Sequence, residues 1–244
     1  MVKKHLKRLS APSFWKVKRK ETKYVTRPRP GPHKLKNCIP LQVLLRDVLG
    51  LVSVGSDARK MIKMGEILVD GKVRKDHKYP VGFMDVVSIP AMKKAYRITI
   101  DYKGLKVLEC PEKESNVKIS MIKNKSLVEK GTLQLNLHDG KNILIPVKNP
   151  KKPSEDIYKS GDSLLIELPS QKILDHFKFE KGNYSLMTNG QNRGLFAKIK
   201  DIIPTRSREP NKVVCEKDGK EFEAIKDYVF IVGKTKPVIT LEGK

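Results

Sequence analysis

The stretch that decides the fold reads PLQVLLRDVLGLVSVGSDARKMIKMGEILVDGKVRKDHKYPVGFMDVVSI, residues 40–89. From Leu41 onward, leucines and valines fall at i, i+3, i+4, i+7 and i+8, which is the spacing of one apolar helix face. A second helix follows, with Ser56 or Asp57 as its expected N-cap and Gly65 where a left-handed C-terminal cap belongs. Two apolar faces so close in sequence predict a packed helix pair.

After these helices the apolar period changes to that of strands. Asp70-Gly71 suits a two-residue type I′ turn, so residues 66–69 and 72–75 are expected to form a hairpin. A closing strand should follow Asp85 at a bend. Basic side chains lie on the second helix and along the hairpin: Arg59, Lys60, Lys63, Lys72, Arg74, Lys75 and Lys78. Such an array suits phosphate oxygens, and we interpret residues 40–89 as an RNA-binding module.

Composition supports this interpretation. The chain has 244 residues, 39% of them hydrophobic, which is enough apolar material to fill the cores of two or more domains. Its 51 Lys and Arg residues face 27 Asp and Glu residues, for a net charge of +24. Holding that much like charge on a folded body costs stability unless a polyanion neutralises it. Nucleic acid is therefore the first partner to consider.

The N-terminal segment, residues 1–39, holds 13 basic residues and one acidic residue, so it carries half of the net charge. Its prolines forbid a continuous helix and favour an extended path. We expect a basic arm that builds no core of its own and becomes ordered on RNA. Phe14, Trp15 and Tyr24 give it flat faces that can stack on bases or pack against the body, and the alternative is a solvated, disordered tail.

The rest of the chain has the patterns of strands. Between Asp-Gly, Asn-Pro and Gly-Asp turns, short apolar runs recur, and residues 132–137 alternate leucine with polar residues. Further on, Gly190 and Gly194 flank a tight polar loop where positive φ is expected. The predicted fold class is a multidomain α+β protein with four segments: a basic arm (1–39), a helix-hairpin domain (40–95), a β-rich middle domain (96–170) and a small β-barrel domain with a C-terminal extension (171–244).

Catalytic chemistry is not indicated. The three cysteines are widely spaced and lack a partner at disulfide or zinc-site spacing, which fits a reducing compartment and predicts no metal site. His138 beside Asp139 is more consistent with a solvated turn than with a general base, because adjacent turn residues do not normally meet. No signal peptide, membrane span, cofactor or small-molecule substrate is expected.

Five blocks resemble one family closely. They are KKHLKRLSAP at residues 3–12, RPRPGPHKL at 27–35, ILVDGKVRKDHKYPVGFMDVVSI at 67–89, KFEKGNYSLMTNGQNRGLFAKI at 178–199 and FIVGKTKP at 230–237. In this order they resemble small-subunit ribosomal protein four of the archaeal and eukaryotic type. The resemblance implies an RNA-binding domain over residues 40–89 and a KOW element, an SH3-like barrel unit, around 182–199. That element often has a third glycine where this chain has Ala197, and a positive φ there would be strained.

The leading hypothesis is a structural constituent of the small ribosomal subunit in the cytoplasm. Its partners would be ribosomal RNA and neighbouring ribosomal proteins, without homo-oligomerisation. The RNA-binding candidates are Lys3, Lys4, Lys7, Arg8, His33, Lys34, Arg59, Lys60, Lys63, Lys72, Arg74, Lys75, Lys78, Asn192 and Arg193. Two alternatives stay open: an RNA-modifying enzyme or synthetase that carries the module as an appendage, and a transcription or RNA-processing factor that uses the KOW element.

Overall fold

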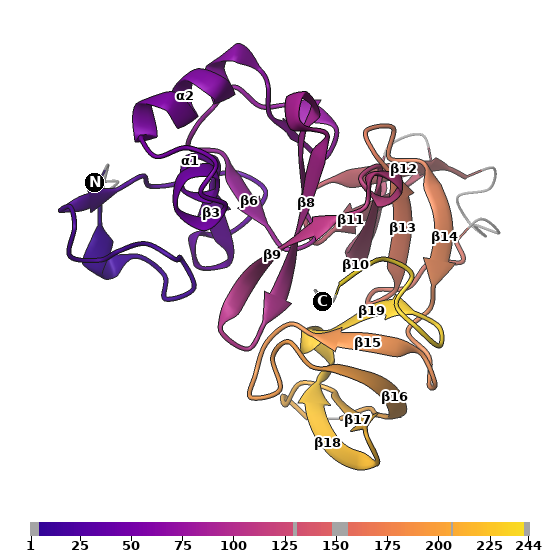
Figure 1. Cartoon of the computed structure of the whole chain (residues 1–244). Coiled ribbons are helices and arrows are strands. Elements are labelled where there is room, and N and C mark those ends of the chain that lie inside the picture. Colours follow the sequence, from indigo (N-terminus) through magenta and orange to yellow (C-terminus); the bar gives the residue numbers. More distant parts are fainter. Residues whose placement is uncertain (1–4, 129–130, 148–155, 206, 242–244) are drawn as a thin grey trace. The chain divides into compact units, whose positions relative to one another are not determined.

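The structure is a computed structural model that describes residues 5–128, 131–147, 156–205 and 207–241 (Figure 1). The chain forms two compact units, residues 1–118 and residues 119–241. Strands dominate both units and helices are few. The coarse α+β prediction is therefore correct, but the division differs from the four predicted segments.

The first unit is built on one antiparallel sheet of five strands. The boundary predicted between residues 95 and 96 lies inside β8, which pairs with β7 through Val86 and Arg97. The residues after the boundary thus continue the hairpin sheet, because β8 supplies the next partner strand. In order across the sheet the strands are β5 (Lys72–Val73), β4 (Leu68–Val69), β7 (Val86–Ile89), β8 (Lys94–Asp101) and β9 (Gly104–Cys110).

The expected helix pair is present, in a shorter form. The first helix consists of α1 (Leu41–Val43) and a π-helical turn, η3 (Leu44–Val48), and it packs against α2 (Gly55–Met64). The prediction of an N-cap at Ser56 or Asp57 is wrong, because α2 begins at Gly55 and its N-cap is Val54. Gln42 Nε2 donates a hydrogen bond to the Gly55 carbonyl at 3.0 Å. Glycine suits this position because a Cβ on residue 55 would stand only 2.7 Å from the same Nε2 atom.

Two local predictions about turns are confirmed. Gly65 ends α2 with φ +83°, the left-handed cap that glycine adopts without strain. Asp70 and Gly71 have φ values of 51° and 72°, as a type I′ turn requires. Asp70 is also buried, and its Oδ1 accepts a hydrogen bond from the Val86 amide at 3.0 Å. The hairpin turn is therefore tied to the closing strand.

The N-terminal segment corrects a prediction, because much of its apolar surface is buried in the free chain. The Trp15 side chain is 2% exposed, and its Nε1 donates a hydrogen bond to the Cys38 carbonyl at 2.9 Å. The expectation that the segment becomes ordered only on RNA is wrong, since this ring packs against the body in the free chain. The elements here are β1 (Leu6–Lys7), η1 (Arg8–Ser10), β2 (Tyr24–Val25), η2 (Leu35–Asn37) and β3 (Cys38–Pro40), and β3 pairs with β6 (Pro80–Gly82).

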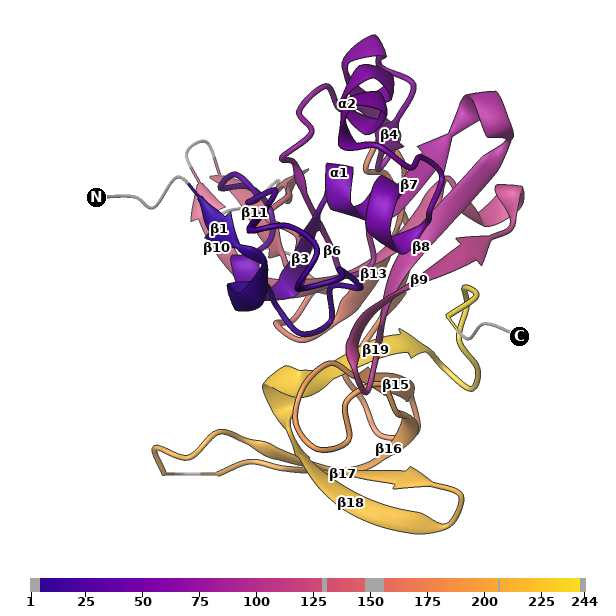
Figure 2. The ribbon, with the colours of Figure 1, turned by 60° about the vertical axis from the view of Figure 1, so that its left-hand side comes forward.

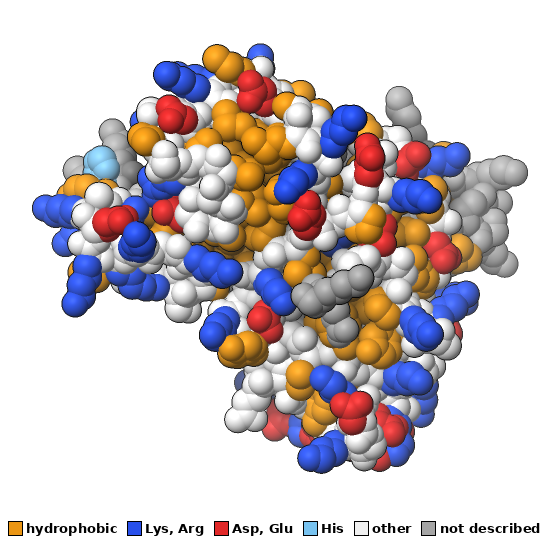
Figure 3. Space-filling model, viewed as in Figure 1, with side chains coloured by type: hydrophobic (Ala, Val, Ile, Leu, Met, Phe, Trp, Pro, Cys, Tyr) orange, Lys and Arg blue, Asp and Glu red, His pale blue; other side chains and the backbone are white. Residues whose placement is uncertain are grey.

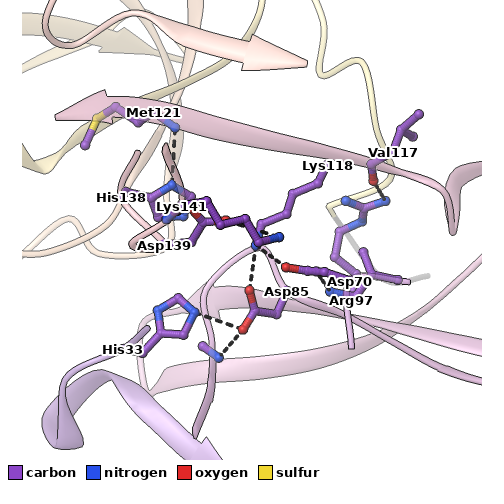
Figure 4. A network of polar contacts seen from close by, with 12 residues as sticks. His33, Asp70, Asp85, Arg97, Val117, Lys118, Met121, His138, Asp139 and Lys141 are labelled. Carbon is purple, nitrogen blue, oxygen red and sulfur yellow. Dashed lines mark hydrogen bonds and ion pairs between the residues drawn. The ribbon is translucent and has the colours of Figure 1, made fainter. Parts of the chain in front are cut away.

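A buried ionic network joins three parts of the first unit (Figure 4). Lys118 is fully buried, and its Nζ lies 2.8 Å from Asp70 Oδ2 and 2.6 Å from Asp85 Oδ1. The other Asp85 oxygen accepts from the Gly82 amide at 2.8 Å and lies 2.9 Å from His33 Nε2. Burial alone would raise the pKa of Asp85, but Lys118 and His33 more than offset it and hold the pKa well below its ordinary value.

The second unit contains two five-stranded antiparallel sheets. The alternation predicted for residues 132–137 is confirmed, since Leu133, Leu135 and Leu137 are buried and the residues between them are half-buried. The first sheet has the order β12 (Asn142–Pro146), β11 (Thr132–Leu137), β10 (Val117–Val128), β13 (Ser163–Glu167), β14 (Ile173–Phe177), and the first two residues of β10 belong to the first unit.

The second sheet carries the glycine loop. Gly190 and Gly194 have φ values of 84° and 80°, which confirms the expected positive φ. Ala197 is a buried strand residue paired with Ser185, and its φ is not positive. The backbone strain that a positive φ would cause at this alanine is therefore absent. The order is β18 (Lys220–Ile225), β17 (Lys212–Lys217), β16 (Phe196–Ile203), β15 (Tyr184–Met187), β19 (Val229–Gly233), with the long β17–β18 hairpin seen in Figure 2. Further short 3-10 turns among the described residues are η4 (Pro90–Met92), η5 (Glu112–Glu114) and η7 (Lys226–Tyr228).

Replacing Lys118 with methionine should lower the free energy of unfolding by about 3–5 kcal/mol, because two buried carboxylates lose their cation. Urea denaturation followed by circular dichroism measures the change. Lys106→Met, at an exposed position of β9, is the matched control and should stay within about 0.5 kcal/mol. A loss for Lys118→Met no larger than the control's would contradict the structural role of the network.

Acid should expose the same network. A carboxyl whose folded pKa is depressed stabilises the fold above its unfolded pKa, and this stabilisation is lost as the pH falls through that value toward the folded pKa. Between about pH 5 and pH 2, therefore, the free energy of unfolding should fall, and less steeply in Asp85→Asn than in the wild type. Denaturation midpoints measured across this range test the expectation, and parallel curves for the two proteins would refute it.

Candidate nucleic-acid interface

The polar face of α2 presents the cations expected there. Arg59, Lys60 and Lys63 are exposed, whereas Ala58 and Ile62 on the opposite face are buried. The helical period separates the two groups, because residues three and four apart share a face. The three cations are therefore available to phosphate groups.

The hairpin and the loop after it add a second cationic surface. Lys72 and Lys75 are exposed, and Arg74 and Lys78 are half-buried. The Arg74 guanidinium lies 4.5 Å from the centroid of the Tyr79 ring, a cation–π contact that restricts its rotamers. This arginine is held in place more firmly than a solvated lysine.

The N-terminal candidates separate into exposed and internally bound side chains. Lys7 and Lys34 are exposed, whereas Lys3 and Lys4 lie outside the described residues. Arg8 is buried, with its Nη1 donating to the Lys18 carbonyl at 2.5 Å and lying 3.2 Å from Glu21. The contacts of this guanidinium hold the N-terminal segment together.

His33 is likewise engaged inside the protein. Its side chain is 7% exposed and lies against Asp85. It stacks on Gly82, where an added Cβ would come within 2.3 Å of the ring. Local sequence patterns do not point to this partner, because Asp85 is 52 residues away.

The candidates of the second unit lie in the loop between β15 and β16. Asn192 and Arg193 are half-buried, and the Arg193 amide donates to the Gly190 carbonyl at 3.4 Å. Burial lowers the pKa of Arg193 from its ordinary value. An arginine in this environment gains from an anionic or hydrogen-bonding partner.

Some surface cations were missed as individual candidates. A groove of about 720 Å³ follows the proline-rich residues 27–35, and Arg27 and Arg29 line it beside Lys78. Arg29 is fixed by an ion pair of 3.1 Å with Asp76. The Arg-Pro-Arg-Pro spacing could have drawn attention to this groove, since prolines hold neighbouring side chains on an extended backbone. Figure 3 shows Lys and Arg side chains spread over the face that it draws.

The cysteine thiols are unsuited to nucleophilic chemistry. Burial raises the pKa of Cys38 to about 12 and that of Cys215 to about 11, so both thiols stay protonated at neutral pH. Within the described ranges, no helix has the length and apolar character needed to cross a membrane. The surface chemistry that remains is dominated by cations.

Three family models match successive parts of the chain: the RS4NT domain at residues 2–36, the S4 domain at 39–87 and ribosomal family S4e at 92–173. The small ribosomal subunit protein eS4 of Methanocaldococcus jannaschii is 47% identical over 240 residues, covering 98% of both chains. This chain belongs to the S4e family of ribosomal proteins. The eS4 protein of Archaeoglobus fulgidus is 46% identical over 99% of both chains.

A solved structure agrees with the family assignment. The crystal structure of 30S ribosomal protein S4e from Thermoplasma acidophilum is similar with a TM-score of 0.67 and 26% identity, over 82% of this chain and 96% of that one. The resemblance predicted from the five sequence blocks is thus confirmed. The S4-domain match spans α1, η3, α2 and the hairpin, so the exposed cations of α2 lie on the surface of that domain.

Replacing both Lys60 and Lys63 with alanine should weaken RNA binding. The magnitude of the slope of log K against log salt concentration should fall by about 2, because each lost lysine–phosphate contact means about one counterion fewer released on binding. Filter binding at several salt concentrations measures both effects. Lys217→Ala/Lys220→Ala, which removes two exposed lysines from the β17–β18 hairpin, is the matched control and should change the slope less. If the α2 variant unfolds but its residual RNA affinity is intact, the face assignment is wrong.

Proposed function

We propose that this protein is a structural constituent of the small ribosomal subunit that binds folded ribosomal RNA. The observation that carries the proposal is the exposed cationic face of α2 and the adjoining hairpin, which lies within the region matched by the S4 domain. Phosphate contacts from this face supply affinity, and the rigid arrangement of helix and hairpin selects an RNA surface of matching shape. Its place of action is the cytoplasmic ribosome, beside other ribosomal proteins.

The two units have different parts in this proposal. Residues 39–87 act as the helix-hairpin RNA-binding domain, with the N-terminal segment extending the basic surface. The sheet of β15 to β19 acts as an SH3-like KOW element, whose glycine loop brings its backbone close to RNA or to a neighbouring protein. Supporting this role, the loop has positive φ at Gly190 and Gly194 and presents Asn192 and Arg193 between them.

A non-catalytic role is the better account of the chain. The relatives that match it over nearly its whole length carry the name of a ribosomal protein. The match therefore leaves no separate segment of the chain that could be an added catalytic domain. The buried thiols of Cys38 and Cys215 also argue against nucleophilic catalysis. Reproducible modification of ribosomal or transfer RNA by the purified protein would favour an enzyme instead.

Association with the subunit is the direct test. The tagged protein should sediment with the small subunit at low salt and enter it during assembly. Crosslinks should join α2 and the hairpin to ribosomal RNA. Sedimentation of the tagged protein away from the small subunit, both in growing cells and during subunit assembly, would refute the proposal.

Affinity of the isolated protein should depend steeply on salt. If about six to ten phosphates are contacted, binding to small-subunit ribosomal RNA weakens by about three to five decades between about 50 and 200 mM salt, because neutralised phosphates release counterions. Titrations at fixed pH over this range measure the dependence. A nearly flat response would contradict binding through phosphate contacts.

A further inference from the structure

A small pocket lies where the N-terminal segment meets the helix pair. Its volume is about 360 Å³, within the range of sites that hold small ligands but too small for a nucleic-acid duplex. Strand β2, the η3 turn, helix α2 and the loop before Tyr79 each contribute to its wall. The lining includes four cationic side chains and three aromatic rings: Arg27, Arg46, Arg59, Lys78, His5, Tyr24 and His77.

The charge in this pocket favours an anion. Among the described residues that line it, none is acidic. Arg46 has a carboxylate partner outside the lining, since its Nη2 lies 2.7 Å from Asp47. Desolvation lowers the pKa of His77, and the pull of Asp76 in the other direction is opposed by Arg59, so the ring is neutral at pH 7 and offers one donor and one acceptor.

Hydrogen bonds hold the wall at Gln42 in place, and the flat ring of Tyr24 forms another part of the lining. Gln42 is buried, with its Oε1 accepting from Thr26 Oγ1 at 2.8 Å and its Nε2 bound to the Gly55 carbonyl. Tyr24 is 49% exposed, and its ring centroid lies 5.5 Å from that of His5. An exposed tyrosine beside cations is the kind of surface on which an unpaired base stacks.

We propose that this pocket takes the base of one unpaired nucleotide of the bound RNA, stacked on Tyr24, with its phosphate at Arg27 and Lys78. These two cations also line the proline-rich groove, so the RNA backbone can continue from the pocket along residues 27–35. The inference rests on the proposed RNA-binding function and adds a site for single-stranded RNA to it. Duplex RNA would supply shape and phosphates but no free base for the pocket.

The test compares Tyr24→Ala with Tyr24→Phe in the full-length protein, using protein-free transcripts of small-subunit ribosomal RNA. Tyr24→Ala should bind about 5- to 150-fold more weakly, because one base loses its stacking partner, whereas Tyr24→Phe should keep most of the affinity. Tyr102→Ala, which removes an exposed tyrosine from the β8–β9 turn, is the matched control and should bind as the wild type does. Thermal melts establish that all three variants fold.

Chemical probing of the RNA supplies the second measurement. At saturating protein, one unpaired base should be protected by the wild type and by Tyr24→Phe, and should become reactive with Tyr24→Ala. Equal affinity and equal protection for the wild type and Tyr24→Ala would overturn the pocket proposal while leaving salt-dependent RNA binding in place. A loss seen only in the complete subunit would overturn it as well, because the occupant would then be a neighbouring protein. Failure of the wild type to bind RNA would instead defeat the proposed function.

Discussion

One buried ammonium group holds the first unit together. Lys118 lies between Asp70 of the hairpin turn and Asp85 of the turn before β7, and Asp85 in turn holds His33 of the N-terminal segment. Two carboxylates in a dry site repel each other and lose their hydration, so neither is stable there without the cation. The single positive charge of Lys118 therefore holds together segments that are far apart in sequence. An apolar cluster of similar volume could be as stable, but it would not specify which turn faces which segment.

This constraint reaches the proposed RNA-binding face through short connections. Asp70 is the first residue of the hairpin turn, and strand β5, which begins with Lys72, follows directly after Gly71. At its other end, the hairpin joins α2 through the left-handed cap at Gly65. Because both ends are fixed, the lysines of the hairpin and the cations of α2 keep a constant spacing. A fixed spacing is what allows a protein without base-specific contacts to select RNA by shape.

The sequence predicted those features that short-range chemistry determines. Positive φ at Gly65 and at Asp70-Gly71, and the alternation of residues 132–137, each follow from a few neighbouring residues. Lys118 was missed because nothing local shows that this lysine, in a run of strand residues, points into a buried site. His33 was expected on the RNA for the same reason, since its partner is distant in sequence. That β8 extends the hairpin sheet across the predicted boundary near residue 95 could not be foreseen, because a strand that follows a turn has the same sequence pattern whether it extends a sheet or begins a new domain.

The packing of Trp15 changes the physical account of the proposed RNA binding. An arm that becomes ordered only on RNA loses conformational entropy at that moment, which lowers its net affinity. Here the burial of Trp15 and its hydrogen bond to Cys38 order the segment during folding. The cations of the same segment, such as Lys7 and Lys34, remain exposed. Apolar side chains therefore preorganise the segment, while its charge stays available to phosphate groups, and Tyr24 and Arg27 gain a rigid position at the pocket as a result.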